Sequence, residues 1–184
     1  MTFLYIILGL IAALIFFVWG TYNRLITFGM RVKEAFADID VQLKRRNDLI
    51  PNLIETVKGY VKHEKETLEK IVQLRSGIAN TKEPGKLAEL DNQMSKAIGG
   101  LNIQIENYPD LKANQNFMEL QRELSDTEDK ISYSRRFYNQ AVLDYNTGIA
   151  LFPASIVARF FKFTKEEFFK AKSEERENVK VKFD

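Results

Sequence analysis

Charged residues are missing from the beginning of this chain, and their absence limits what that segment can become. All 27 basic and 25 acidic side chains lie at or beyond Arg24. Residues 3–20 form 18 consecutive apolar or glycine positions. As a helix they extend about 27 Å, close to the roughly 30 Å hydrocarbon core of a bilayer. With a short extension to Tyr22, residues 1–22 are therefore predicted to form a single transmembrane anchor.

A cleaved signal peptide is the competing interpretation of this segment. It would require a basic start, an apolar core of about 7 to 15 residues and a cleavage site made of small residues. Only Met1 and Thr2 precede the apolar run, which ends on the bulky residues 16–19 (FFVW). Trp19 and Tyr22 also fit the aromatic belt at a membrane interface. We therefore expect an anchor that stays attached.

The orientation of the anchor follows from basic residues near its end. Arg24, Arg31 and Lys33 lie just beyond it, whereas no basic side chain precedes it. The positive-inside rule therefore predicts that the N-terminus lies outside the cell membrane and that the rest of the chain is cytoplasmic. Acidic residues in the same flank leave the reverse topology open.

Beyond the anchor, apolar residues recur at alternating steps of three and four from Tyr22 to Ile78. This spacing has the period of 3.5 residues that is typical of coiled-coil helices. Pro51 falls inside the run, and an interior proline destabilises a helix by about 3 kcal/mol. The spacing nevertheless keeps its phase on both sides of Pro51. One long helix over 22–78, kinked at Pro51, is therefore predicted.

The same periodicity predicts helices over 86–107 and 110–151 and a short helix over 154–163, separated by turn-forming and proline residues. No segment alternates in the manner of a half-buried strand. We therefore predict an all-α fold, an elongated, up-and-down antiparallel bundle over residues 23–170 behind the transmembrane helix. The charged residues 171–184 are expected to form a flexible tail.

Recognisable motifs for catalysis or metal binding are absent from the sequence. The zinc motif HExxH needs a second histidine four residues after His63, where Thr67 stands. His63 is the one histidine in a chain without cysteine, so we expect it to have a packing or hydrogen-bonding role. A net charge of +2 with both signs interspersed disfavours nucleic acid as a partner. We expect no enzymatic activity, no catalytic, cofactor-binding or metal site, no cofactor and no small-molecule substrate.

Two features rise above this background. Arg46 occupies a position of the apolar spacing between Leu43 and Ile50. This predicts an arginine that snorkels to the surface, a structural pair with an acid on another helix, or a regulatory or partner contact. The stretch from Phe160 to Phe169 interleaves phenylalanines with basic residues. It is predicted either to lie on a membrane surface or to pack on the end of the bundle.

Several blocks of sequence resemble the LemA family of bacterial membrane proteins. They are DVQLKRRNDLIPNL at 40–53, VKGY at 57–60, HE at 63–64, YPDLKA at 108–113, NF at 116–117, LQ at 120–121, EL at 123–124, TE at 127–128 and YN at 138–139. The resemblance extends to about Phe163. It implies a helical bundle behind an N-terminal membrane helix in the bacterial cell membrane, without established enzymatic activity. It also implies a link to HtpX-like membrane zinc proteases and to a magnetosome-associated protein.

The leading hypothesis is therefore a membrane-anchored, non-catalytic scaffold or adaptor that acts through helix contacts and self-association, with the lipid bilayer and a second copy of the chain as partners. The alternative is a signal-relay or regulatory subunit of a membrane complex, such as one with an HtpX-like protease. The candidate interaction or hinge residues are Arg45, Arg46, Asp48, Pro51 and Asn52.

Overall fold

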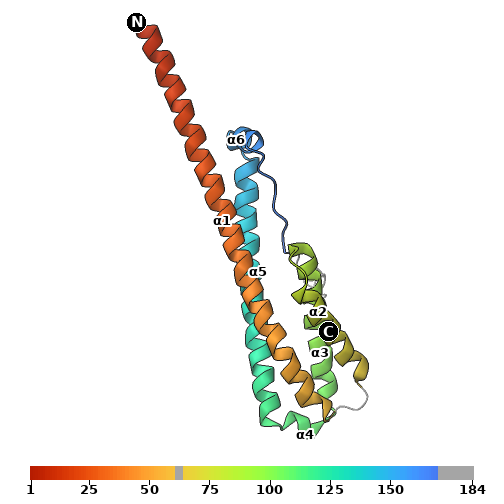
Figure 1. The fold of residues 1–184 in the computed structure, drawn as a ribbon. Coiled ribbons are helices and arrows are strands. Elements are labelled where there is room, and N and C mark those ends of the chain that lie inside the picture. The colour runs from red at the N-terminus through yellow and green to blue at the C-terminus, as the bar shows by residue number, and fades with distance from the viewer. Residues whose placement is uncertain (61–63, 170–184) are drawn as a thin grey trace, which may run out of the picture.

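The computed structural model describes residues 1–60 and 64–169, and within these ranges the chain is all-helical without a strand. The helices are α1 (Thr2–Lys58), α2 (Lys65–Ala79), α3 (Pro84–Ile105), α4 (Pro109–Lys112), α5 (Gln115–Ala150) and α6 (Ala154–Phe160). α1, α2, α3 and α5 alternate in direction and form an elongated bundle (Figure 1). The predicted all-α antiparallel bundle with an N-terminal apolar helix is confirmed.

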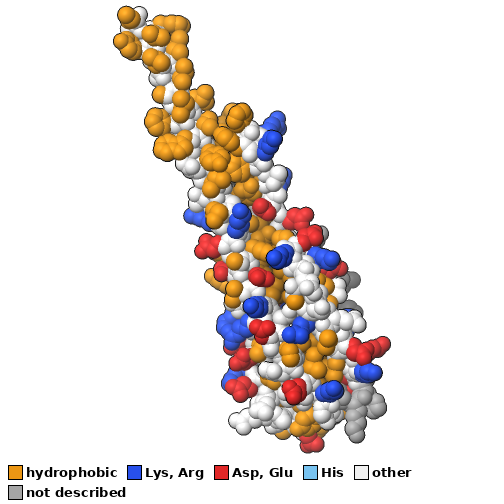
Figure 2. Space-filling model, in the orientation of Figure 1, with side chains coloured by type: hydrophobic (Ala, Val, Ile, Leu, Met, Phe, Trp, Pro, Cys, Tyr) orange, Lys and Arg blue, Asp and Glu red, His pale blue; other side chains and the backbone are white. Residues whose placement is uncertain are grey.

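The N-terminal part of α1 projects beyond the rest of the molecule (Figures 1 and 2). This part is long and apolar enough to cross a membrane, and none of its most apolar stretch is buried by other elements. α1 then continues into the bundle as one helix of 57 residues. A candidate membrane span and the bundle core therefore share one unbroken helix.

The core follows the predicted spacing of apolar residues. α1 buries residues at steps of three and four along one face, among them Leu25, Val32, Ile39 and Leu43. α5 runs antiparallel to α1 and presents a matching buried face. At Gly148 of α5 an added Cβ would lie 3.2 Å from the ring of Phe28, so glycine permits the close approach of the two helices.

The prediction of one helix over 22–78 is wrong beyond Lys58. α1 passes through Pro51 as predicted but ends at Lys58, and α2 runs back along the bundle beside α3. Ile71, Leu74 and Ile78 of α2 are buried. A helix continuing beyond Lys58 would leave this apolar face in water, whereas the reversal buries it in the common core.

Polar contacts link the segments that meet at this turn. The Tyr108 hydroxyl donates to the Glu64 carboxylate at 3.1 Å, and Asn114 Nδ2 donates to the Tyr60 hydroxyl at 3.3 Å. The helix predicted over 110–151 is also divided here, into α4 and α5. Asn114 caps α5, since its side-chain oxygen accepts from the backbone N–H groups of Asn116 and Phe117.

α6 ends at Phe160, before the predicted end at residue 163, because residues 161–162 form a turn. The chain then runs back along α5 as an extended segment, and we call residues 161–169 the strap (Figure 1). Phe169 at its end is buried, and Phe163 is partly buried against the core. This part of the phenylalanine-rich stretch therefore packs on the bundle. His63 and the predicted tail, residues 171–184, lie outside the described residues.

Candidate functional site

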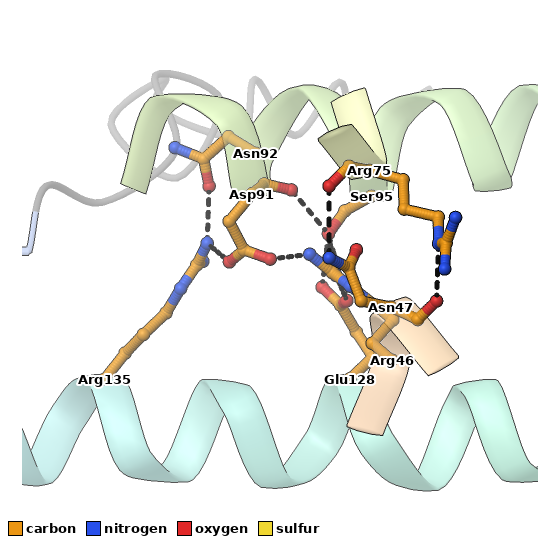
Figure 3. Close-up of polar contacts among 8 residues, drawn as sticks. All are labelled: Arg46, Asn47, Arg75, Asp91, Asn92, Ser95, Glu128 and Arg135. Carbon is orange, nitrogen blue, oxygen red and sulfur yellow. Dashed lines mark hydrogen bonds and ion pairs between the residues drawn. The ribbon is translucent and has the colours of Figure 1, made fainter. Parts of the chain in front are cut away.

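Arg46 lies in the interior of the bundle with only 2% of its surface exposed. Its guanidinium forms ion pairs with Asp91 of α3 and with Glu128 of α5, the latter at 2.7 Å between Nη1 and Oε2. The same Nη1 donates to Ser95 Oγ at 3.1 Å. One arginine thereby connects three helices (Figure 3). The predicted structural pairing of Arg46 with an acid on another helix is confirmed.

Asp91 lies between two arginines in this cluster (Figure 3). It is fully buried, and its second carboxylate oxygen pairs with Arg135 of α5. Arg135 Nη2 also donates to Asn92 Oδ1 at 2.9 Å. We call Arg46, Asp91, Glu128 and Arg135 the ion-pair cluster. Its two positive and two negative charges offset one another, which reduces the cost of burying them.

Burial lowers the pKa of the Arg46 guanidinium to about 10. The negative charge of Glu128 opposes this shift, while the positive charge of Arg135 adds to it. A pKa of about 10 still leaves Arg46 protonated at neutral pH. Arg46 therefore carries a full positive charge in the cluster under physiological conditions.

Pro51 is linked to a second polar contact, between α1 and α2. Because proline has no backbone N–H, the carbonyl four residues earlier, that of Asn47, lacks its usual helical donor. Arg75 of α2 takes that place, since its Nε donates to the Asn47 carbonyl at 3.0 Å. In return, Asn47 Nδ2 donates to the Arg75 carbonyl at 3.1 Å. Pro51 thus leaves the Asn47 carbonyl free to accept a hydrogen bond from Arg75 of α2.

The five residues predicted from the sequence do not form one site. Arg46 points into the core, whereas Asp48, Pro51 and Asn52 are exposed. Arg45 is also exposed and lies 3.7 Å from Glu123 of α5. Asp48 instead lines a groove between α1 and α2 with a volume of about 690 Å³.

Sequence reasoning missed the residues that bind Arg46, which are Asp91, Ser95 and Glu128. It also missed Arg135, which pairs with Asp91, and the contact between Asn47 and Arg75 near Pro51. For Asp91 a signal was present. It stands four residues after Leu87 and three before Met94, at a step of the apolar face of α3. A carboxylate and a guanidinium that both occupy apolar steps of different helices are candidates for a buried pair.

Part of the ion-pair cluster borders a groove of about 620 Å³ between α3 and α5. Arg46, Ser95 and Glu128 line it together with apolar side chains such as Met118 and Leu124. The Ser95 hydroxyl lies 2.9 Å from the Glu128 carboxylate, so these polar groups bind one another. Among the described residues, no three His, Asp or Glu side chains are placed to hold a metal ion.

The fold and the cluster define a class of helical-bundle proteins in which a long apolar N-terminal helix runs directly into an ion-paired core. The LemA family model matches residues 35–183, and the chain belongs to the LemA family. It is 32% identical over 161 residues to Protein LemA of Metamycoplasma hominis. This match covers 87% of this chain and 74% of that relative.

More distant similarity is found to magnetosome proteins. The chain is 23% identical over 177 residues to magnetosome protein MamQ of Magnetospirillum gryphiswaldense, covering 82% of this chain and 65% of MamQ. It is 22% identical to MamQ 2 of Paramagnetospirillum magneticum over the same length. None of these relatives is named after a reaction.

Proposed function

We propose that this protein is a membrane-anchored, non-catalytic scaffold or adaptor that works through helix contacts and self-association. The observation that carries the proposal is the continuity of α1, which joins a candidate membrane span to the bundle core in one helix. The buried charged residues Arg46 and Asp91 support it as well, because they are paired in the ion-pair cluster. Such pairing favours one arrangement of the helices, and the paired charges have a structural role.

We infer that a helix from another chain binds the groove between α3 and α5. Ile98 and Met118 contribute accessible apolar side chains to it, Leu53 and Leu124 are buried, and polar side chains complete its lining. Apolar grooves between helices are a common mode of binding for an amphipathic helix. A second copy of the chain supplies such helices at high local concentration in a membrane.

Site-directed crosslinking in native membranes tests this proposal, since the chain has no cysteine of its own. A thiol-reactive photo-crosslinker would be attached to a Met118→Cys variant at the groove and to a Tyr133→Cys variant as a control. Both side chains are well exposed, but Tyr133 lies away from this groove. We expect specific adducts from position 118 that are weak or absent at 133. Strict monomers without a partner at both positions would refute the scaffold role.

A second candidate function is a signal-relay or regulatory subunit of a membrane complex, for example with an HtpX-like zinc protease. The unbroken passage of α1 through Pro51 favours it, because a tilt of the span would reach Arg46 and the contact between Asn47 and Arg75. A Pro51→Ala variant should remain folded or become more stable, yet alter the cellular phenotype of the wild-type chain. An unchanged phenotype would count against a relay.

We place the bundle on the cytoplasmic side of the bacterial cell membrane with the N-terminus outside, as the basic residues from Arg24 onward support. A Lys172→Cys variant in intact cells tests this orientation. A membrane-impermeant thiol reagent should label it only after the cells are permeabilised. Labelling in intact cells would show that the bundle lies outside the cell and would refute the proposed orientation.

A further inference from the structure

α6 crosses the end of the bundle from which the apolar part of α1 emerges (Figure 1). The axes of α5 and α6 differ by 92°. The ring of Tyr22 on α1 lies 4.7 Å from that of Phe161 and 5.8 Å from that of Phe163, measured between centroids. These contacts place α6 at the level of Tyr22, where the uncharged segment of the chain ends.

The two sides of α6 differ in their surroundings. Val157 and Ala158 are buried against the bundle. Ile156 and Phe160 lie four residues apart on α6 and are 62% and 78% exposed, and Phe152 in the turn before α6 is 81% exposed. Residues four apart lie on one face of a helix. α6 therefore packs through one side and presents large apolar side chains on another.

A single exposed apolar residue needs no explanation, but adjacent ones mark an interaction surface. Figure 2 shows hydrophobic side chains at this end of the bundle beside the projecting helix, with basic side chains close by. Arg24 on α1, Arg159 on α6 and the following Lys162 are the exposed cations of this region. Aromatic and aliphatic side chains flanked by cations are typical of segments that lie in the membrane interface.

We propose that α6 is a membrane-contacting foot, in which Phe152, Ile156 and Phe160 enter the interface while Arg159 and Lys162 bind lipid phosphates. The bilayer is favoured as the occupant because the patch adjoins the candidate span directly. A helix of seven residues is too short to hold a protein on a membrane, so α1 supplies the attachment. The foot fixes the tilt and rotation of the bundle, which a single spanning helix leaves free.

This inference rests on the proposed membrane insertion of α1 and does not depend on the scaffold role. The full-length chain in vesicles of phosphatidylcholine and phosphatidylglycerol with brominated acyl chains tests both points separately. Trp19 is the one tryptophan of the wild-type chain and reports on the span. A Trp19→Phe/Phe160→Trp variant reports on the foot. A Trp19→Phe/Tyr133→Trp variant is the control, because Tyr133 is exposed along the side of the bundle.

We expect the brominated lipids to quench the fluorescence of Trp19 and of the tryptophan at position 160. The emission maximum of the tryptophan at 160 should lie at a shorter wavelength than that of the tryptophan at 133. The tryptophan at 133 should emit at long wavelength without quenching. If the variant at position 160 does not fold, a Trp19→Phe/Phe152→Trp variant reports on the turn that leads into α6, since Phe152 is even more exposed.

Quenching of Trp19 without quenching at position 160 would refute the foot and leave the anchor standing. Blue-shifted but unquenched emission at 160 would also refute it, because another protein chain would then cover the patch. If neither Trp19 nor position 160 is quenched, the membrane insertion fails, and the foot fails with it.

Discussion

At the scale of single residues, the bundle buries two opposite charges that stabilise each other. Arg46 and Asp91 are almost fully enclosed, and each lies against the other. Replacing a buried ion pair by apolar groups of similar volume is often neutral, but removing one partner leaves an uncompensated charge. The arrangement therefore has little value as an isolated attraction. Its effect is to penalise any packing of α1, α3 and α5 that separates the partners.

Asp91→Ala should destabilise the protein by about 3 to 5 kcal/mol, because Arg46 and Arg135 would then remain buried close together with only Glu128 to balance them. The matched control is Arg45→Ala, which removes an exposed contact with Glu123 and should change stability by about 1 kcal/mol or less. Urea unfolding in detergent, followed by circular dichroism, measures both. Equal losses in the two variants would mean that the cluster does not hold the helices together.

Tyr138 gives a test that depends on pH. Burial raises the pKa of its hydroxyl to about 12, and the negative charges of Glu166 and Glu167 add to this shift. Because the folded pKa lies above the unfolded one, near 10, the neutral hydroxyl stabilises the fold fully below pH 10. This contribution is lost as the pH rises through 12.

Tyr138→Phe should therefore cost about 1 kcal/mol at pH 8, through the lost hydrogen bond to the Glu167 carbonyl at 2.8 Å. The gap between variant and wild type should narrow between pH 10 and 12, where only the wild type has this hydroxyl to ionise. Urea midpoints of both proteins at pH 8 and pH 11 provide the comparison. A constant gap would show that the Tyr138 hydroxyl does not control the alkaline response.

At the scale of helices, the spacing of apolar residues predicted buried faces but not the reversal of the chain after Lys58. Leu43, Ile50, Ile71 and Ile78 are buried as expected, because a residue on a core-facing step is buried whichever helix carries it. The apolar spacing keeps the same phase before Lys58 and after Lys65. The reversal between these residues therefore left no signal in the sequence pattern.

The candidate site was predictable to a similar degree. A charged residue at an apolar position, Arg46, made a buried ion pair one of the expected outcomes. Asp91 also stands at an apolar position, so it could have been proposed as the partner. Glu128 and Arg135 could not be assigned, because their roles depend on how α5 is shifted along α1. That shift results from packing across the whole length of the two helices, for example where Gly148 admits Phe28.

The contact between α1 and α2 can be isolated by a double-mutant cycle on Pro51 and Arg75. Arg75→Met in the wild-type background should cost about 1 kcal/mol, because the Asn47 carbonyl loses its donor. In a Pro51→Ala background the restored N–H of residue 51 can serve that carbonyl, so the same change should cost less. The free energies of unfolding of the four proteins give the coupling. Additive effects would show that the two residues act independently.

At the scale of the whole molecule, the helices of the bundle differ greatly in length. α5 has 36 residues, whereas α2 has 15 and α3 has 22, so part of the long pair of α1 and α5 extends beyond α2 and α3. The strap runs along this part (Figure 1). Its Phe169 contacts the ring of Tyr138 at 6.4 Å between centroids and covers the core there. The strap thus covers the part of α1 and α5 that α2 and α3 do not reach. It also links α6 to the rest of the fold.

Two asparagines of α5 hold the backbone of the strap. Asn146 donates to the Glu166 carbonyl at 2.9 Å and accepts from its N–H at 2.9 Å. Asn139 makes the same pair of bonds with Phe169, at 2.9 and 2.8 Å. Replacing both by alanine removes four hydrogen bonds, which is about 2 to 6 kcal/mol at usual values for each bond. This loss falls on a segment that has few other polar contacts.

Asn139→Ala/Asn146→Ala should therefore release the strap before the bundle unfolds. Hydrogen exchange in detergent should show faster exchange of the strap amides, while amides in the middle of α1 and α5 stay protected. Gln140→Ala is the matched control, because the Gln140 side chain donates within α5, to Asp144. If the double variant exchanges faster throughout α1 and α5, the strap is an inseparable part of the core. If it exchanges like the control, the asparagines do not hold the strap, and α6 owes its position to the buried Val157 and Ala158 and to the ring contacts of Tyr22.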